Sequence, residues 1–209
     1  MGIDLVLFDL DDVLVDYSRE VRCSVLGERI GRSAQAVHAA LFDCGLEREA
    51  DLGRASAEDV SRTLSGALRT EVTVADCVAA RAAAMQPRPA LLPVLDALRS
   101  RCRLAILTNN GLMVREHFAA LCPDYAPYFE GNVHCSALYG TEKPDPEVFL
   151  RCADALGVAP GRVLFVDDRP ENADGAVRAG MSGHHYLDLT GLHTALAAHR
   201  LLETRPHVA

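Results

Sequence analysis

Two pairs of acidic residues stand where parallel strands of a sheet are expected to end. Asp9 and Asp11 directly follow the apolar run 3–8, and Asp167-Asp168 follows the apolar run 163–166. Residues two apart in extended chain point the same way, and open parallel sheets bind ligands outside the carboxyl ends of their strands. Clustered carboxylates repel one another unless a cation holds them, and hard oxygen ligands favour magnesium over zinc. The spacing therefore predicts a Mg²⁺ site.

Other polar residues are expected at the same edge. Thr108, Asn109 and Asn110 follow a second predicted strand, and Gly111 then begins a predicted helix. A hydroxyl and backbone N–H groups at a helix N-terminus suit phosphate oxygens, although Thr and Asn are also ordinary helix caps. Lys143 is the one lysine beside 20 arginines. One interpretation is that the chain favours arginine throughout and that this lysine remains by chance. The other is that position 143 needs a compact ammonium to neutralise the acids or a bound phosphate.

The elements that must position these residues can be read from hydrophobic periodicity. Short apolar runs alternate with helical patterns after residue 88, which is typical of a parallel sheet with helices on both faces. Residues 18–85 carry helix signals alone, including capping boxes at Ser56-x-x-Asp59 and Thr73-x-x-Asp76. We therefore expect an α/β fold, a Rossmann-like doubly wound parallel sheet formed by residues 1–15 and 88–209. An all-helical cap, residues 16–87, is inserted after its first strand.

Composition limits the class of protein. Of the 209 residues, 49% are hydrophobic and 24% charged, enough to bury a core, which excludes disorder as the main state. The formal net charge of −8 argues against nucleic-acid binding through phosphate neutralisation. No apolar run reaches the length of a membrane span, and no signal peptide is recognisable. Seven scattered cysteines indicate reduced thiols, so we expect a cytoplasmic protein with no membrane partner and leave its oligomeric state open.

The order of these motifs resembles the haloacid dehalogenase superfamily. Its four signature motifs correspond to Asp9-Leu10-Asp11, then Thr108-Asn109, then Lys143-Pro144, then Asp167-Asp168. The helical insertion lies between the first and second motifs, which is the position of the C1 type of cap in that superfamily. The resemblance implies the haloacid dehalogenase-like core fold, with phosphatases as one of its branches.

The resemblance also implies residue roles for phosphoryl transfer. Asp9 would be the nucleophile that forms an aspartyl-phosphate, and Asp11 would act as general acid and then general base. Mg²⁺ would be bound by the carboxylate of Asp9, the backbone carbonyl of Asp11 and the carboxylate of Asp168.

Four further residues would support that centre. Thr108, Asn109 and Lys143 would hold the phosphate oxygens that do not react. Asp167 would lie behind the ligands and orient Lys143 or a metal-bound water.

The first motif departs from the family pattern. Asp12-Val13 stands where the family usually has Gly-Thr. The family glycine eases the backbone near the metal, and Asp tolerates unusual backbone conformations better than most residues. Asp11 is retained, and because dehalogenases of the family lack an acid there, it favours phosphate chemistry.

We expect the cap to supply selectivity. The stretch 45–53 is predicted to be a solvated surface loop, and the alternative is that Arg48 or Arg54 reaches the leaving group of the substrate when the cap closes.

The sequence thus predicts a magnesium-dependent phosphomonoester hydrolase that acts on a small cytosolic metabolite. The alternatives are a sugar-phosphate phosphomutase, a 2-haloacid dehalogenase, or a non-catalytic phosphate-binding regulatory protein on the same fold.

Overall fold

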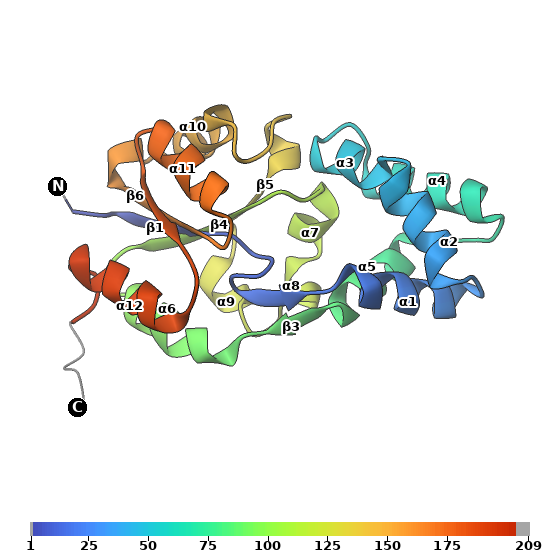
Figure 1. Cartoon of the computed structure of the whole chain (residues 1–209), viewed down its shortest axis with the longest axis horizontal. Helices are drawn as coiled ribbons and strands as arrows, with labels where there is room; N and C mark the ends of the chain where they lie inside the picture. Colours follow the sequence, from blue (N-terminus) through green and yellow to red (C-terminus); the bar gives the residue numbers. More distant parts are fainter. Residues whose placement is uncertain (1, 204–209) are drawn as a thin grey trace.

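A five-stranded parallel sheet forms the centre of the molecule (Figure 1). The computed structural model describes residues 2–203. Its strand order is β5-β4-β1-β6-β7, and every neighbouring pair is parallel. The strands are β1 (Leu5–Phe8), β4 (Arg103–Thr108), β5 (Val133–Cys135), β6 (Val163–Asp167) and β7 (Ser182–His185). This arrangement confirms the predicted fold class.

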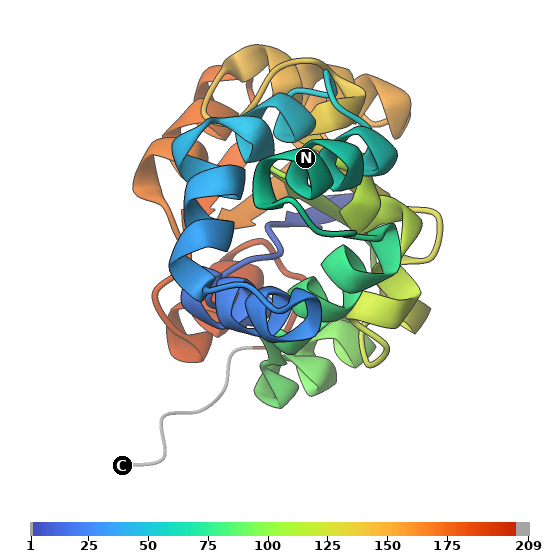
Figure 2. The same cartoon turned by 90° about the vertical axis from the view of Figure 1, so that its right-hand side faces the viewer.

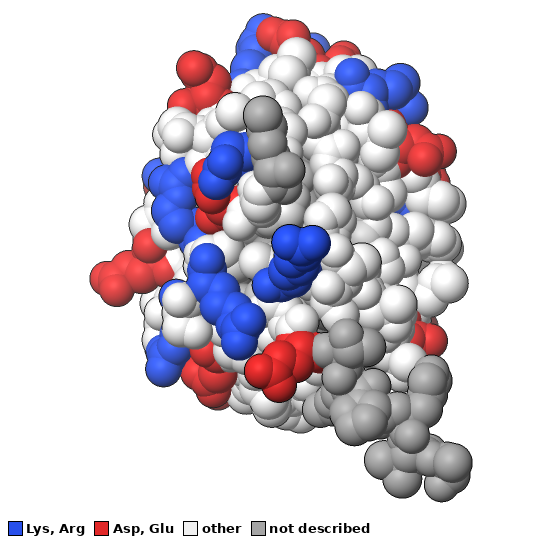
Figure 3. All heavy atoms as spheres, turned by 90° about the vertical axis from the view of Figure 1, so that its left-hand side faces the viewer, with Lys and Arg blue, Asp and Glu red and all other residues white. Residues whose placement is uncertain are grey.

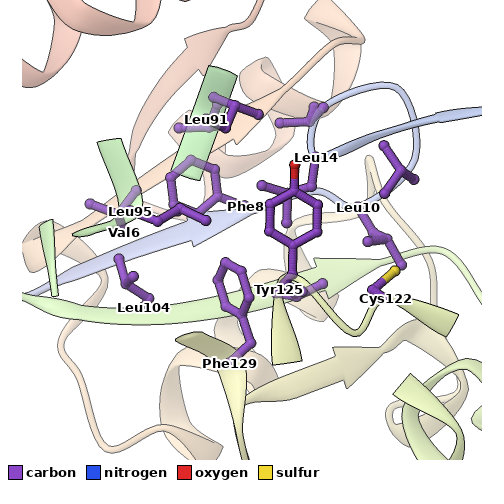
Figure 4. Close-up of a cluster of buried hydrophobic side chains, with 14 of the residues drawn as sticks. Val6, Phe8, Leu10, Leu14, Leu91, Leu95, Leu104, Cys122, Tyr125 and Phe129 are labelled. Atoms are coloured by element: carbon purple, nitrogen blue, oxygen red, sulfur yellow. The ribbon is translucent and has the colours of Figure 1, made fainter. Parts of the chain in front are cut away.

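Helices cover both faces of the sheet because its strands are apolar on both sides. Leu5 and Leu7 of β1 point into one hydrophobic cluster and Val6 and Phe8 into the other. Figure 4 shows Phe8 in the second cluster, close to Tyr125 and Phe129. The covering helices are α10 (Pro146–Ala155) and α11 (Pro170–Arg178) on one face, and α6 (Leu92–Leu98), α8 (Phe118–Leu121), α9 (Ala126–Phe129) and α12 (Leu189–Ala198) on the other. Helix α7 (Leu112–Glu116) follows β4.

Residues 19–83 are helical and pack around a third cluster of buried side chains. We call them the helical segment. Its elements are α1 (Arg19–Ile30), α2 (Ala34–His38), a π-helical turn (Ala39–Asp43), α3 (Leu46–Asp51), α4 (Ala57–Leu68) and α5 (Val74–Ala83). An antiparallel pair of short strands, β2 (Val15–Tyr17) and β3 (Met85–Pro87), joins the segment to the rest of the chain. Figure 2 views the molecule from this segment, whose helices lie in front of the sheet.

Side-chain caps are present at the starts of four helices of this segment. Ser18 and Ser33 accept hydrogen bonds at the starts of α1 and α2. Both predicted capping boxes form, at Ser56 and at Thr73. Each cap gives a partner to backbone N–H groups that would otherwise lack one. This contributes about 1 kcal/mol to the stability of the protein.

Three local predictions were wrong or incomplete. The stretch 45–53 is not a loop but contains α3, which buries Leu46 and Ala50 one helical turn apart. The helix predicted to begin at Gly111 is divided into α7 and α8 at His117, whose φ of −111° and ψ of 17° lie outside the helical region. The β2–β3 pair was not predicted, because three-residue strands leave too short a pattern to detect.

The surface farthest from the helical segment carries interspersed charges (Figure 3). Among the surface ion pairs of the molecule, Arg162 is paired with Asp4, and Arg99 with Asp96. Within residues 2–203, the longest helices fall short of the length and apolar character that crossing a bilayer requires.

Candidate active site

A cleft of about 820 Å³ opens where β1, β4 and β6 end, between the sheet and the helical segment. Most of the residues singled out in the sequence line it, although they are far apart in the chain. Its lining residues include Asp9, Asp11, Asp12, Thr108, Asn109, Lys143 and Asp168. Parallel strands place their carboxyl ends at one edge, and that geometry gathers these side chains.

Lys143 lies at the centre of this group. Its Nζ is 2.9 Å from Asp9 Oδ1 and 2.6 Å from Asp167 Oδ2, and its side chain is almost completely buried. Burial disfavours the ammonium, but Asp9 and Asp167 outweigh that effect and raise the pKa of Lys143 above its ordinary value. The only lysine of the chain is therefore a fixed positive charge between two acids.

Asn109 holds the backbone of Lys143 from both sides. Its Nδ2 donates to the Lys143 carbonyl at 2.9 Å, and its Oδ1 accepts from the Lys143 N–H at 2.9 Å. This amide side chain is thus engaged with protein, not directed at a phosphate as predicted. We interpret Asn109 as a positioning residue for Lys143. Thr108, a second predicted phosphate ligand, is buried, and its Oγ1 accepts a 2.8 Å hydrogen bond from Asn110.

The side chain of Asp167 is surrounded by donors. One oxygen accepts from the Arg169 N–H at 2.9 Å, the other accepts from Lys143, and Asn172 Nδ2 lies within 3.1 Å of both. Asp167 is completely buried. Its oxygens are therefore committed to protein, which agrees with the predicted supporting position behind the cleft.

The acids at the base of the cleft form a group suited to a cation. Asp9, Asp167 and Asp168 each offer a carboxylate oxygen, and these atoms lie within 4.8 Å of one another. Because Asp167 is committed elsewhere, Asp9 and Asp168 supply the oxygens that remain. Burial raises the pKa of Asp9 against the pull of Lys143, and burial also raises the pKa of Asp168. Three carboxylates beside one ammonium leave negative charge that a hard divalent cation would offset, so the residues fit Mg²⁺.

Asp12 has a positive φ at the position where the family resemblance places glycine. Its φ is +60°, in the left-handed region where Asp is better tolerated than most side chains. Its N–H donates to the Val15 carbonyl at 2.7 Å, and its Oδ1 accepts from the Tyr17 N–H at 3.2 Å. The substitution is thus accommodated by a turn that leads directly into β2.

Asp11 is paired with a buried arginine of the helical segment. Arg81 Nη2, from α5, lies 2.7 and 2.6 Å from the two oxygens of Asp11. Asn110 Nδ2 donates to the same carboxylate at 3.1 Å. The guanidinium of Arg81 also lies over the ring of Tyr17, 3.8 Å from its centroid.

Arg48 and Arg54 do not line the cleft. Both are exposed and paired with acids, Arg48 with Glu142 at 3.1 Å and Arg54 with Glu49 at 3.2 Å. The sequence predicted that one of them contacts the leaving group when the helical segment closes over the cleft. That contact stays a prediction. The residue of α3 that does line the cleft is Asp51, whose Oδ1 is buried and has no hydrogen-bond partner among the described residues.

Sequence reasoning missed Arg81, Asp51 and Asn172 as members of this region. An arginine within an amphipathic helix is normally exposed, so nothing in the periodicity of residues 74–83 indicates the burial of Arg81. Asp51 was hidden in a charged stretch taken for a loop. Asn172 had a usable signal, because it lies in the first turn of the helix after Asp167-Asp168.

Comparison with known proteins agrees with this geometry. The haloacid dehalogenase-like hydrolase family matches residues 3–180. The chain belongs to this family. It is therefore an enzyme of the hydrolase class, and phosphatases are among its relatives. A glyceraldehyde 3-phosphate phosphatase from Methanopyrus kandleri is 32% identical over 200 residues, 86% of this chain and 82% of the relative. A phosphatase from Mycobacterium tuberculosis is 34% identical over 100 residues, 47% of this chain and 46% of that protein.

Solved structures share the fold over nearly the whole chain. A haloacid dehalogenase-like hydrolase from Porphyromonas gingivalis is 26% identical with a TM-score of 0.75, covering 98% of this chain and 100% of that one. A family enzyme from Bacteroides thetaiotaomicron, in complex with magnesium and inorganic phosphate, is 21% identical with a TM-score of 0.74, covering 91% and 99%. At that identity the likeness concerns the fold alone.

Proposed function

We propose that this protein is a magnesium-dependent phosphomonoester hydrolase that acts on a small phosphorylated metabolite. The observation that carries the proposal is the convergence of Asp9, Lys143 and Asp168 in one cleft. Membership of the hydrolase family and the named phosphatase relatives support it. Retention of an acid at Asp11 favours phosphate esters over haloacids as substrates.

In this proposal Asp9 is the nucleophile. One of its oxygens forms a bond to phosphorus while the bond from phosphorus to the leaving oxygen breaks, which gives an aspartyl-phosphate. Oδ1 of Asp9 accepts hydrogen bonds from the Leu10 N–H at 2.8 Å and from Lys143. These two donors fix the orientation of the carboxylate before substrate binds, and such fixed orientation is a main source of rate enhancement.

Asp9, Asp168 and the backbone carbonyl of Asp11 are the proposed ligands of Mg²⁺. When bound, the ion offsets the repulsion between a carboxylate nucleophile and a phosphate dianion. Lys143 contributes in the same direction from within the protein, and the hydroxyl of Thr108 is a candidate donor to a phosphate oxygen. Asn109 and Asp167 keep the ammonium of Lys143 in place.

Asp11 is the proposed general acid and base. In its protonated form Asp11 passes a proton to the leaving oxygen as the ester bond breaks. It later takes a proton from the water that attacks the aspartyl-phosphate, which restores the protonated form. The water oxygen bonds to phosphorus, the bond to Asp9 breaks, and inorganic phosphate leaves with Asp9 restored.

We propose that residues 16–87 act as a cap domain over a core of residues 1–15 and 88–209. Tyr17, Arg19 and Asp51 bring this part of the chain to the cleft wall. The leaving group of the substrate would lie against them. We propose that the helical segment moves about the β2–β3 pair. The chain enters the segment through β2 and leaves it through β3, and among residues 2–203 this is the only strand pair formed by these two connections.

The direct test is phosphate release from p-nitrophenyl phosphate with and without Mg²⁺. Asp9→Asn keeps the size of the side chain but weakens its nucleophilicity, so we expect turnover to fall by at least about 10³-fold. EDTA should abolish the activity of the wild-type protein, and added Mg²⁺ should restore it. Asp154→Asn, a change at an exposed acid of α10, serves as the control. Unchanged turnover in Asp9→Asn would refute the assigned nucleophile.

A further inference from the structure

Arg81 is a buried cation that the proposed chemistry does not explain. It comes from α5 of the helical segment, and only 1% of its surface is exposed. Burying a guanidinium is costly unless it is paired and hydrogen-bonded. The acid that pairs with it is Asp11. Burial lowers the pKa of Arg81, but Asp11 and Tyr17 together outweigh that effect, so the pKa of Arg81 is raised.

The pairing is not part of the internal scaffold of the helical segment. Arg22, the other buried arginine of that segment, binds Glu47 and Tyr17, so both of its partners lie within residues 17–47. Among the described residues, Arg81 has its one carboxylate partner on the core side, in the loop that follows β1. The Nε of Arg81 has no hydrogen-bond partner among the described residues, and Arg81 is one of the residues that line a cavity of about 30 Å³, large enough for a single water.

The neighbouring side chains hold the carboxylate of Asp11 in one position. Arg81 Nη2 reaches both of its oxygens, Asn110 Nδ2 reaches one, and the ring of Tyr17 holds the guanidinium plane on one side. A carboxylate with these partners is restricted in rotamer. Proton transfer requires the general acid to lie within hydrogen-bond distance of the reacting oxygen, so the rotamer of Asp11 affects the rate directly.

We propose that Arg81 is the positioning residue for Asp11, so that the helical segment sets where the general acid and base lies in the cleft. This inference rests on the proposed function. It assigns Arg81 a role that differs from both scaffolding and substrate contact. Movement of α5 would displace Arg81 and Asp11 together, which couples the arrangement of the helical segment to proton transfer.

Leaving groups of different acidity provide the test. p-Nitrophenolate leaves without a proton, whereas phenolate benefits from one, and the two esters have nearly the same shape. In Arg81→Met we expect kcat/KM to fall about 10–100-fold for phenyl phosphate and less than about threefold for p-nitrophenyl phosphate. Arg81→Lys, which retains one cation, should recover part of the loss for phenyl phosphate. It also carries the test if Arg81→Met does not fold.

Two further variants separate positioning from general damage. Arg22→Met removes a comparably buried arginine of the same segment. It should lower kcat/KM by the same factor for both esters, or leave kcat/KM unchanged for both. In an Asp11→Ala background, Arg81→Met should have no further effect on the ratio between the esters, because the group it positions is gone.

The outcomes are distinct. An equal loss on both esters in Arg81→Met, or a further change of their ratio in the Asp11→Ala background, would overturn the positioning role. Faster turnover of both esters in Arg81→Met would also overturn it, since Arg81 would then restrain Asp11 and not position it. Failure of the wild-type protein to release phosphate from either ester would instead count against the proposed function.

Discussion

At the scale of single residues, the cleft is organised by donors that hold acids in fixed places. Asp167 receives hydrogen bonds from Lys143, Asn172 and the Arg169 N–H, and Asp11 receives them from Arg81 and Asn110. Asp51 is the exception, because its buried Oδ1 has no partner among the described residues. Burial, assisted by nearby Glu47, raises the pKa of Asp51 to about 8.

That raised pKa gives Asp51 a predictable effect on stability. The folded protein retains the proton of Asp51 up to about pH 8, whereas the unfolded chain loses it near pH 4. The stabilisation that the protonated side chain of Asp51 gives to the folded state is therefore fully present below pH 4 and is lost as the pH rises toward 8. The side chain in Asp51→Asn cannot ionise, so the free energy of unfolding of this variant should rise relative to that of wild type by on the order of 4 kcal/mol between pH 5 and pH 9. Urea unfolding at several pH values measures this. Glu49→Gln, at an exposed residue of the same helix, should give a flat difference, and a flat difference for Asp51→Asn too would contradict the assignment.

At the scale of elements, close packing of α11 places the loop that carries Lys143. A Cβ on Gly175 would lie 2.5 Å from the Pro144 carbonyl oxygen and 3.0 Å from Phe149 Cε2. Gly175→Ala must therefore push the Lys143–Pro144 loop away from α11. We expect a loss of about 1–3 kcal/mol in the free energy of unfolding together with reduced phosphatase activity. Gly66→Ala is the matched control: it lies within α4 with open space around it, and it should stabilise by up to about 1 kcal/mol. Equal effects of the two substitutions, measured by thermal melts and phosphate release, would show that packing at α11 is unimportant.

The elements also show what the sequence could and could not predict. Buried strands and capped helices were predictable because apolar runs and caps such as Ser56 and Thr73 are local signals. The residues that β1, β4 and β6 gather at one edge were predictable from the rule for parallel sheets. The burial of Arg81 was not, because it depends on where the whole of α5 lies against the loop after β1. The engagement of Asn109 with the Lys143 backbone also depends on two loops that are distant in the chain.

At the scale of the whole molecule, a bound cation should link the cleft to global stability. A ligand that binds only the folded state stabilises it by about 2.7 kcal/mol at 100 times its Kd. For a chain of this length that corresponds to a rise in Tm of about 5–10 °C. We expect saturating Mg²⁺ to raise the Tm of wild type in this range and to have little effect on Asp168→Asn. Asp154→Asn, which alters an exposed acid of α10, should respond as wild type does. The same rise in Asp168→Asn would exclude Asp168 as a ligand.

The buried position of Lys143 has a practical consequence. Since the surface cations of this chain are arginines, reagents that acylate or alkylate primary amines find no lysine side chain on the described surface. Amine-directed dyes, cross-linkers and coupling resins should therefore leave the exterior of the protein unlabelled at its side chains. Reaction at Lys143 would report that solvent has entered the base of the cleft, which makes slow amine labelling a simple gauge of how far the molecule opens.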